Sequence, residues 1–257
     1  MYKRQPPSCP ARLDIRRAVA HVAGAEGGVP KATVRALAQR NVFLIQTAAD
    51  VALSAVPAPD LPVTTGERDG VTWLKQEIPG DGDWHGMSFA VALASRGGSR
   101  AVAIVTSLES RDIVGGAVKL ASGVAQGDQA SSIRAHEAAW ARFWAASGID
   151  IDDALLRNAW YQNLYFLRCV SKRGAVAPGL FASLINDSPA WHGDYHTNYN
   201  IQQTFWTAYN TNHPDLAEPY DRLIASYFPR AKWLAREVFG CGGAYYPHVL
   251  FAYEPPP

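Results

Sequence analysis

The sequence contains few cysteines, and their positions exclude the structures that cysteines commonly build. Among 257 residues there are three, Cys9, Cys169 and Cys241. An odd number at such wide spacing gives neither a disulfide framework nor the closely spaced pairs of a zinc site. We therefore expect these side chains to be buried as small hydrophobic groups.

An excess of charge and long apolar runs are also missing. Lys plus Arg total 24 and Asp plus Glu total 23, so no field of one sign is present to attract nucleic acid or an anionic membrane. The sequence has no run of about 18 apolar residues, the length that a membrane-spanning helix needs. It therefore predicts neither a nucleic-acid partner nor membrane insertion.

The two ends of the chain have the character of a fragment. Residues 1–5 resemble a translated sequencing-library adaptor and lead into a proline-rich stretch without the apolar core of a signal peptide. The chain stops at Pro257, immediately after Glu254 and two further prolines. We expect residues 1–5 to be an artefact and the chain to be part of a longer protein.

The N-terminal part, residues 1–110, has the pattern of strands separated by turns. Residues 41–46 form an apolar run of strand length. Apolar residues alternate over 87–93, and a Gly97-Gly98 turn then precedes the run 101–106, which predicts an antiparallel hairpin. We expect an antiparallel β-sandwich in this part.

The periodicity then changes to that of helices. Apolar residues three and four apart predict helices over 112–124, 131–144, 152–173, 201–209 and 215–239. Asp152 is placed to cap the third of them, whose apolar face begins at Leu155 and Leu156. Consecutive helices joined by loops indicate an antiparallel helical array.

The densest cluster of polar and aromatic side chains spans residues 191–206. A buried segment would have to satisfy all of these donors and acceptors, whereas a ligand cleft uses such groups to orient a substrate. Trp191 and Trp206 offer flat faces to a sugar ring, and His196 and Thr197 can hydrogen-bond hydroxyl groups. The composition of this stretch predicts a polar ligand cleft, and sugars are one class of ligand that such groups can bind.

Two asparagines in this cluster have the spacing of a water-holding pair. Asn198 and Asn200 are two residues apart, so an extended backbone would aim both side chains to one side. Their amide oxygens can then hold a water molecule with a lone pair directed at an electrophile, although a carboxylate is still needed as the base. The alternative stays open that both asparagines cap the helix that begins near Ile201.

The histidines invite a metal-site interpretation that their surroundings disfavour. His192, Asp194 and the distant His248 imitate a site of two histidines and one carboxylate. Such iron sites usually lie among strands, whereas the pattern here is that of a loop beside helices. We predict no metal and no cofactor. His136, next to Glu137, is expected to be an exposed or capping residue with a structural role.

From His136 to His248 the chain resembles glycoside hydrolase family 95, the inverting α-L-fucosidases and α-L-galactosidases. The resemblance rests on motifs in the family's order: the helix 136–144, the helix 160–167, the loop 178–181, the stretch Trp191-x-Gly193-x-Tyr195-x-Thr197-Asn198-x-Asn200-Ile201-Gln202, Trp206 and Gly240-Cys241.

The resemblance implies a multidomain protein of β and α parts. Residues 1–110 would be a partial β-sandwich, 111–150 a helical linker and 151–257 the first part of an (α/α)6 barrel. It further implies that Asn198 and Asn200 hold the nucleophilic water with the help of an aspartate, and that His196 lines the sugar pocket. A glutamate would protonate the leaving oxygen.

In the family, the acid and the base come from later barrel helices, which we expect beyond Pro257, so the fragment alone is expected to be inactive. The implied partner is a carbohydrate, and the implied location is secreted or periplasmic. Two alternatives stay open: a phosphate-dependent disaccharide phosphorylase with a related sandwich and barrel, and a non-catalytic carbohydrate-binding fragment.

Overall fold

A computed structural model describes residues 11–22, 31–55, 61–180 and 190–250 of the protein. The chain divides into two compact units, Met1–Trp144 and Ala145–Pro257. The three-part division into 1–110, 111–150 and 151–257 stays a prediction.

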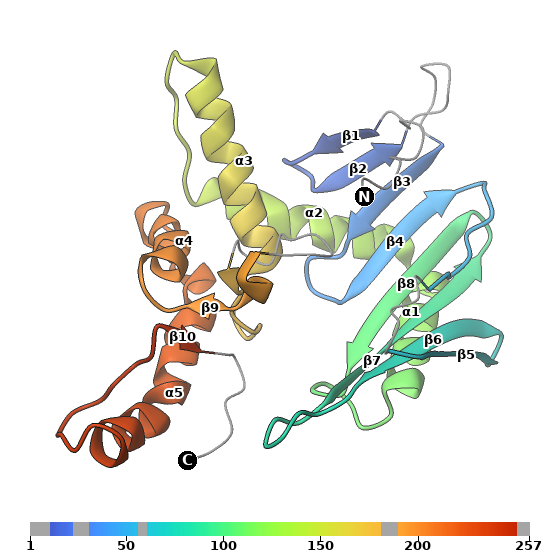
Figure 1. The fold of residues 1–257 in the computed structure, drawn as a ribbon. Helices are drawn as coiled ribbons and strands as arrows, with labels where there is room; N and C mark the ends of the chain where they lie inside the picture. Colours follow the sequence, from blue (N-terminus) through green and yellow to red (C-terminus); the bar gives the residue numbers. More distant parts are fainter. Residues whose placement is uncertain (1–10, 23–30, 56–60, 181–189, 251–257) are drawn as a thin grey trace. The chain divides into compact units, whose positions relative to one another are not determined.

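The first unit is built on one antiparallel sheet (Figure 1). Its eight strands are β1 (Ala11–Asp14), β2 (Val19–Val22), β3 (Ala32–Ala36), β4 (Val42–Thr47), β5 (Val63–Arg68), β6 (Val71–Ile78), β7 (Met87–Arg96) and β8 (Ser99–Thr106). Their order across the sheet is β1-β2-β3-β4-β8-β7-β6-β5. In the described ranges of this unit the strands form this single sheet, so the second sheet of a sandwich stays a prediction.

The predicted hairpin is confirmed as β7 and β8. The strands pair from Arg96 opposite Ser99 outward, and the two-residue turn between them has Gly97 at φ +56°. That left-handed backbone favours glycine, because a side chain there would crowd the following carbonyl. The turn thereby sets the register of the two strands.

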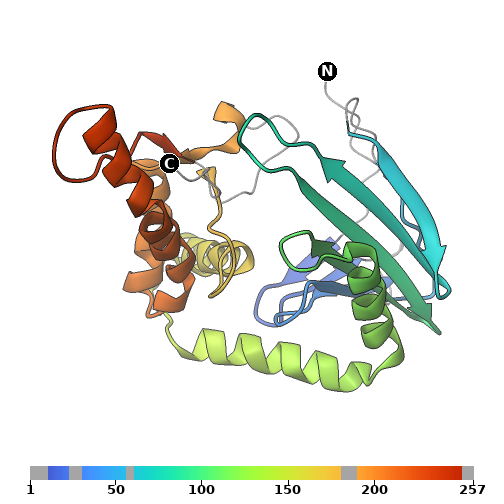
Figure 2. The same cartoon turned by 90° about the horizontal axis from the view of Figure 1, so that it is seen from below.

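Small residues on this hairpin let a helix lie close against the sheet. Ala90 and Ala92 of β7 and Ala101 and Ala103 of β8 are fully buried, and α1 (Ile113–Gln126) packs on that face (Figure 2). The helix begins where the sequence predicts: the Asp112 carboxylate caps it by accepting from the Gly115 amide at 2.8 Å. This layer of helix on sheet forms the core of the first unit.

The following helix, α2 (Gln129–Ala145), corrects the expectation for His136. That side chain is only 2% exposed, and it lies in the interior of α2 and not at either end, so it is neither exposed nor a cap. Its Nδ1 accepts from the Ala38 amide at 3.2 Å, and its Nε2 lies 2.9 Å from the Arg17 carbonyl oxygen. Because Nδ1 accepts, the ring proton is on Nε2 and the histidine is neutral. Its role is structural, as predicted.

The second unit consists mainly of helices. Its elements are α3 (Ala154–Val170), the 3₁₀ turn η2 (Ala190–Gly193), β9 (Tyr195–His196), α4 (Tyr199–Asn210), the 3₁₀ turn η3 (Pro214–Leu216), α5 (Glu218–Glu237) and β10 (Val249–Leu250). Buried side chains from these elements form its core, including Leu164, Leu167, Ile201, Phe205, Leu216, Leu223 and Tyr227. Pro229 lies inside α5, and Gly240, at φ +62°, follows the end of the helix.

The helix α3 differs from its prediction in two respects, its N-cap residue and the extent to which its apolar face is buried. The cap is Asp153, whose carboxylate accepts from the Leu155 and Leu156 amides at 2.9 and 3.0 Å, so the assignment to Asp152 is wrong. Leu155 and Leu156 are 78% and 59% exposed. The predicted apolar face is therefore buried only in the second half of the helix.

The cysteines also differ from their prediction. Cys169 and Cys241 are both free and exposed, so the expectation that they are buried is wrong. Cys9 lies outside the described residues. Periodicity places Cys169 on α3 but does not say which faces of that helix other elements cover.

Candidate functional site

The predicted site begins with a close backbone approach inside the second unit. The Leu180 amide donates to the Asp194 carbonyl at 2.7 Å, and the Tyr195 hydroxyl donates to the Ala177 carbonyl at 2.7 Å. A Cβ atom at Gly179 would lie 2.6 Å from the Gly193 carbonyl oxygen. The glycine is needed there, because only a residue without a side chain lets the two segments meet.

A short pairing then brings a distant segment to the site. β9 and β10 are antiparallel, with His196 opposite Val249 and Tyr195 opposite Leu250. Thr197 adds three bonds: its amide donates to the His248 carbonyl at 2.9 Å, and its hydroxyl is shared between the Pro247 carbonyl at 2.5 Å and the His248 carbonyl at 3.1 Å. The donor of the Thr197 hydroxyl is thus used within the protein, and its lone pairs remain for a ligand.

Asp194, His196 and His248 form a cluster around this pairing. The His196 Nδ1 and the Asp194 Oδ1 are 2.5 Å apart, and both side chains are 13% exposed. The His248 ring meets the His196 ring edge to face, with centroids 4.8 Å apart and an interplanar angle of 70°. Trp191 is a further neighbour of His196, at a centroid distance of 5.5 Å. The His196 ring is therefore held by three neighbours.

The backbone at the two asparagines is not extended, so the predicted reason for their shared direction is wrong. Asn198 is the N-cap residue of α4 and Asn200 lies in its first turn. The alternative that both act as caps also fails for Asn198, whose side chain makes no capping hydrogen bond. Its Nδ2 instead lies 3.4 Å from the His248 Nδ1. Both asparagine side chains are exposed.

The aromatic residues of the stretch form two exposed groups. Trp191 is 61% exposed and has a left-handed backbone, φ +49°. Trp206 is 50% exposed and packs edge to face on Tyr199. The preceding residue of α4, Phe205, is buried. Exposed indoles are suited to stack on the apolar face of a sugar, and Tyr199 joins them as a residue that the sequence reasoning did not single out.

The histidines form no metal site in the described part of the chain. No group of three or more His, Cys, Asp or Glu side chains is arranged there to hold a metal ion. The side chain of His192 lies outside that part. His248 nevertheless belongs to the site, through a pairing of two-residue strands that is too short to leave a periodic signal in the sequence.

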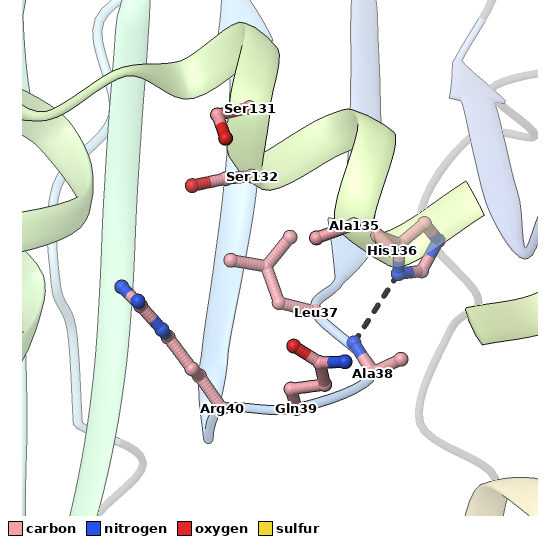
Figure 3. Close-up of a pocket in the computed structure, with 8 residues that line it drawn as sticks. All are labelled: Leu37, Ala38, Gln39, Arg40, Ser131, Ser132, Ala135 and His136. Carbon is pink, nitrogen blue, oxygen red and sulfur yellow. Dashed lines mark hydrogen bonds between the residues drawn. The ribbon is translucent and has the colours of Figure 1, made fainter. Parts of the chain in front are cut away.

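The first unit contains a separate small pocket between α2 and the loop from β3 to β4 (Figure 3). It is lined by Leu37, Ala38, Gln39, Arg40, Ser131, Ser132, Ala135 and His136. None of the predicted site residues is among them. His136 lines it with both ring nitrogens engaged by the backbone, which fits a structural role.

Within the described residues, no helix is both long enough and apolar enough to cross a membrane.

Two of the motifs that carry the resemblance lie in contact, because the loop around Gly179 contacts the segment around Asp194.

Comparison with known proteins connects this arrangement to a family. "Probable alpha-fucosidase A" of Aspergillus niger is 30% identical over 86 residues, which are 33% of this chain and 11% of that protein. The chain thus spans about a tenth of the length of this curated relative. Among solved structures, "Putative kojibiose phosphorylase from human microbiome" is similar over 93% of this chain and 37% of its own, with a TM-score of 0.63. The identity is 11%, so that similarity shows the fold alone.

The match that decides the family covers the helical part of the chain. A model of the glycosyl hydrolase family 95 catalytic domain matches residues 125–254, half of the chain. This range includes all six residues predicted from the sequence to form the site. The chain therefore belongs to glycosyl hydrolase family 95.

Proposed function

We propose that the protein hydrolyses terminal α-L-fucosyl or α-L-galactosyl residues of oligosaccharides or polysaccharides with inversion, and that Asn198 and Asn200 hold the attacking water. The family supports the reaction class, and the relative named alpha-fucosidase A supports the sugar. A secreted or periplasmic location goes with such substrates. In this proposal residues 111–150 are a helical linker and residues 151–257 contribute the first helices of an (α/α)6 barrel.

The proposal rests on the Asn198 side chain, which is at the N-terminus of α4 but is not used to cap the helix. Asn198 occupies the N-cap position, and its amide nitrogen faces His248. Its side-chain oxygen does not cap the helix, and in this proposal it is the acceptor that holds the attacking water. Asn200, exposed in the first turn of the same helix, offers a second amide oxygen.

The end of α4 adds an electrostatic reason. The first amides of a helix have no partner within the helix, and the aligned peptide dipoles give this end a partial positive charge. A water molecule that loses a proton during attack becomes more negative, so this position stabilises it more in the transition state than in the ground state. The asparagines would provide the orientation, because an amide cannot act as the base.

The sugar would lie against the aromatic groups of the same stretch. Trp191 and Trp206 are exposed and can stack on its apolar face, while His196 and the lone pairs of Thr197 face its hydroxyl groups. Inversion also needs an acid and a base about 6.5–9.5 Å apart. Asp194 is committed to His196, so the proposal assigns both roles to carboxylates outside this cluster.

The test is turnover by the product of the complete gene with a fucosylated oligosaccharide, followed by NMR of the released anomer. Because the reaction inverts the anomeric carbon of an α-L-fucoside, we expect β-L-fucose as the first product. Asn198→Ala and Asn200→Ala should each lower kcat by about 100-fold or more, since misplacing a reacting group by about 1 Å costs on that order. Asn210→Ala, at the other end of α4 and also exposed, is the matched control and should keep full turnover.

Two results would redirect the assignment. Wild-type turnover in both site variants would remove the asparagines from the mechanism. Turnover that requires inorganic phosphate and yields a sugar phosphate would show the phosphorylase alternative, which the fold similarity to the kojibiose phosphorylase keeps open. Calorimetric binding of fucosides without any turnover would leave a carbohydrate-binding protein.

A further inference from the structure

The contact between Asp194 and His196 fixes which ring nitrogen carries a proton. An ionised carboxylate only accepts hydrogen bonds, so the nitrogen that lies 2.5 Å from it, Nδ1 of His196, is the donor. In the neutral imidazole the other nitrogen, Nε2, then has a lone pair and accepts. The carboxylate thus selects one tautomer of His196.

The neighbours of the ring fix its orientation as well. His248 packs edge to face on it, and Trp191 lies at 5.5 Å with an interplanar angle of 52°. His248 itself is placed by the backbone bonds that join Thr197 to the segment before β10. The ring therefore has little freedom to turn its Nδ1 away from Asp194.

We infer that Asp194 is a positioning residue that presents the His196 Nε2 as a hydrogen-bond acceptor, so that this site selects a sugar whose hydroxyl group donates to it. The inference rests on the proposed function for the identity of the sugar, but the tautomer does not depend on it. A site built to receive a hydroxyl donor rejects analogues that lack the hydroxyl, because a buried polar group is then left without a partner.

The first test measures the tautomer without any substrate. Long-range ¹H–¹⁵N NMR at about pH 8, above the usual range of histidine pKa values, distinguishes a protonated ring nitrogen from a bare one. The His196 signal is assigned by its loss in His196→Gln. We expect Nδ1–H in the wild type, Nε2–H as the main form in Asp194→Ala, and Nδ1–H again in Asp194→Asn, whose side-chain oxygen still accepts.

The second test measures binding of L-fucose by calorimetry. Asp194→Ala should raise Kd about tenfold, equivalent to about 1.4 kcal/mol, and Asp194→Asn should recover most of that loss. Asp221→Ala is the matched control: Asp221 also accepts a hydrogen bond, from the Tyr209 hydroxyl at 3.2 Å, but touches none of the cluster. It should leave Kd and the His196 tautomer unchanged.

The outcomes distinguish the effect of Asp194 on the His196 tautomer from the effect of that tautomer on sugar binding. An Nε2–H tautomer in the wild type, or an unchanged tautomer in Asp194→Ala, overturns the role of Asp194. A changed tautomer with unchanged fucose binding overturns the selection of a hydroxyl donor. If the wild type does not bind fucose, the proposed function fails, and the NMR result alone decides whether Asp194 fixes the tautomer.

Discussion

Gly179 is the residue on which the geometry of the site most directly depends. A methyl group there would lie 2.6 Å from the Gly193 carbonyl oxygen, which is a backbone atom that cannot swing aside. We expect Gly179→Ala to lower the free energy of unfolding by about 1–3 kcal/mol, the usual cost of overpacking. Chemical denaturation measures this loss.

Gly242 provides the control for that prediction. It lies in the same unit, and a Cβ atom placed on it meets nothing within 4 Å. Gly242→Ala should therefore leave stability nearly unchanged. Equal stability of the two variants would show that the segments around residues 179 and 193 do not approach as described.

His136 links stability to pH. Burial lowers its pKa below the ordinary 6.5, with the Arg17 and Ala18 carbonyls opposing that shift and the charges of Arg35 and Glu137 acting in opposite directions. The folded state thus favours the neutral ring, and protonation would set a second N–H against the Ala38 amide. Its contribution is complete above about pH 6.5 and is lost as the pH falls through the lowered pKa.

The measurement compares urea denaturation of the wild type and His136→Gln between about pH 8 and pH 5. Glutamine can accept from Ala38 and donate to Arg17 but does not titrate. We expect the stability of the wild type to fall more steeply on acidification, by up to about 1.4 kcal/mol per pH unit. Parallel curves for the two proteins would contradict the neutral, buried histidine.

At the scale of single residues, the sequence predicted which side chains would lie near one another but not the backbone geometry that places them. The residue types of the stretch 191–206 indicated a polar ligand site, and the structure gathers Trp191, His196 and Asn198 around one cluster. The N-x-N spacing led to a wrong prediction of extended backbone, because an alternation of only two residues does not distinguish a strand from the start of a helix.

Among the elements, the cap of α3 gives the sharpest test. The Asp153 carboxylate accepts from two amides of the first turn, whereas Asp152 precedes the cap. Asp153→Ala should lower the free energy of unfolding by about 1 kcal/mol, as for other N-cap removals. Asp152→Ala makes the same change of charge one residue away and should have little effect. A larger loss for Asp152→Ala would restore the assignment made from sequence.

Long elements were predictable and short ones were not. The helices α1, α2 and α3 and the hairpin of β7 and β8 have enough residues for their periods to be recognised, and each lies where expected to within a few residues. β9 and β10 have two residues each and pair across about fifty residues of chain. Their pairing depends on tertiary contacts, including the three bonds made by Thr197, that leave no local signal.

For the whole molecule, the change from strand to helix periodicity indicated a protein of β and α parts. It could not reveal whether the strands form one sheet or two, because alternation shows that a strand has a buried face but not which layer covers that face. Here α1 covers a face of the eight-stranded sheet. The barrel to which the second unit is assigned stays a proposal, since helical periodicity is the same in a barrel and in a bundle.

The division into two units predicts two unfolding transitions. Each unit has its own core, around α1 and the sheet in the first and around Leu164, Phe205 and Leu216 in the second. Units with separate cores need not unfold together. Differential scanning calorimetry should therefore resolve two transitions, and variants should shift them selectively.

The two substitutions with local structural costs provide the probes. His136→Ala leaves the Ala38 amide without its partner and should lower only the transition of the first unit, by about 2–8 °C for a loss of about 1–2 kcal/mol. Gly179→Ala should lower only the other transition, for the steric reason given above. A single transition that both variants lower equally would mean that the two cores unfold as one cooperative structure, because a local loss then reduces the stability of the whole chain.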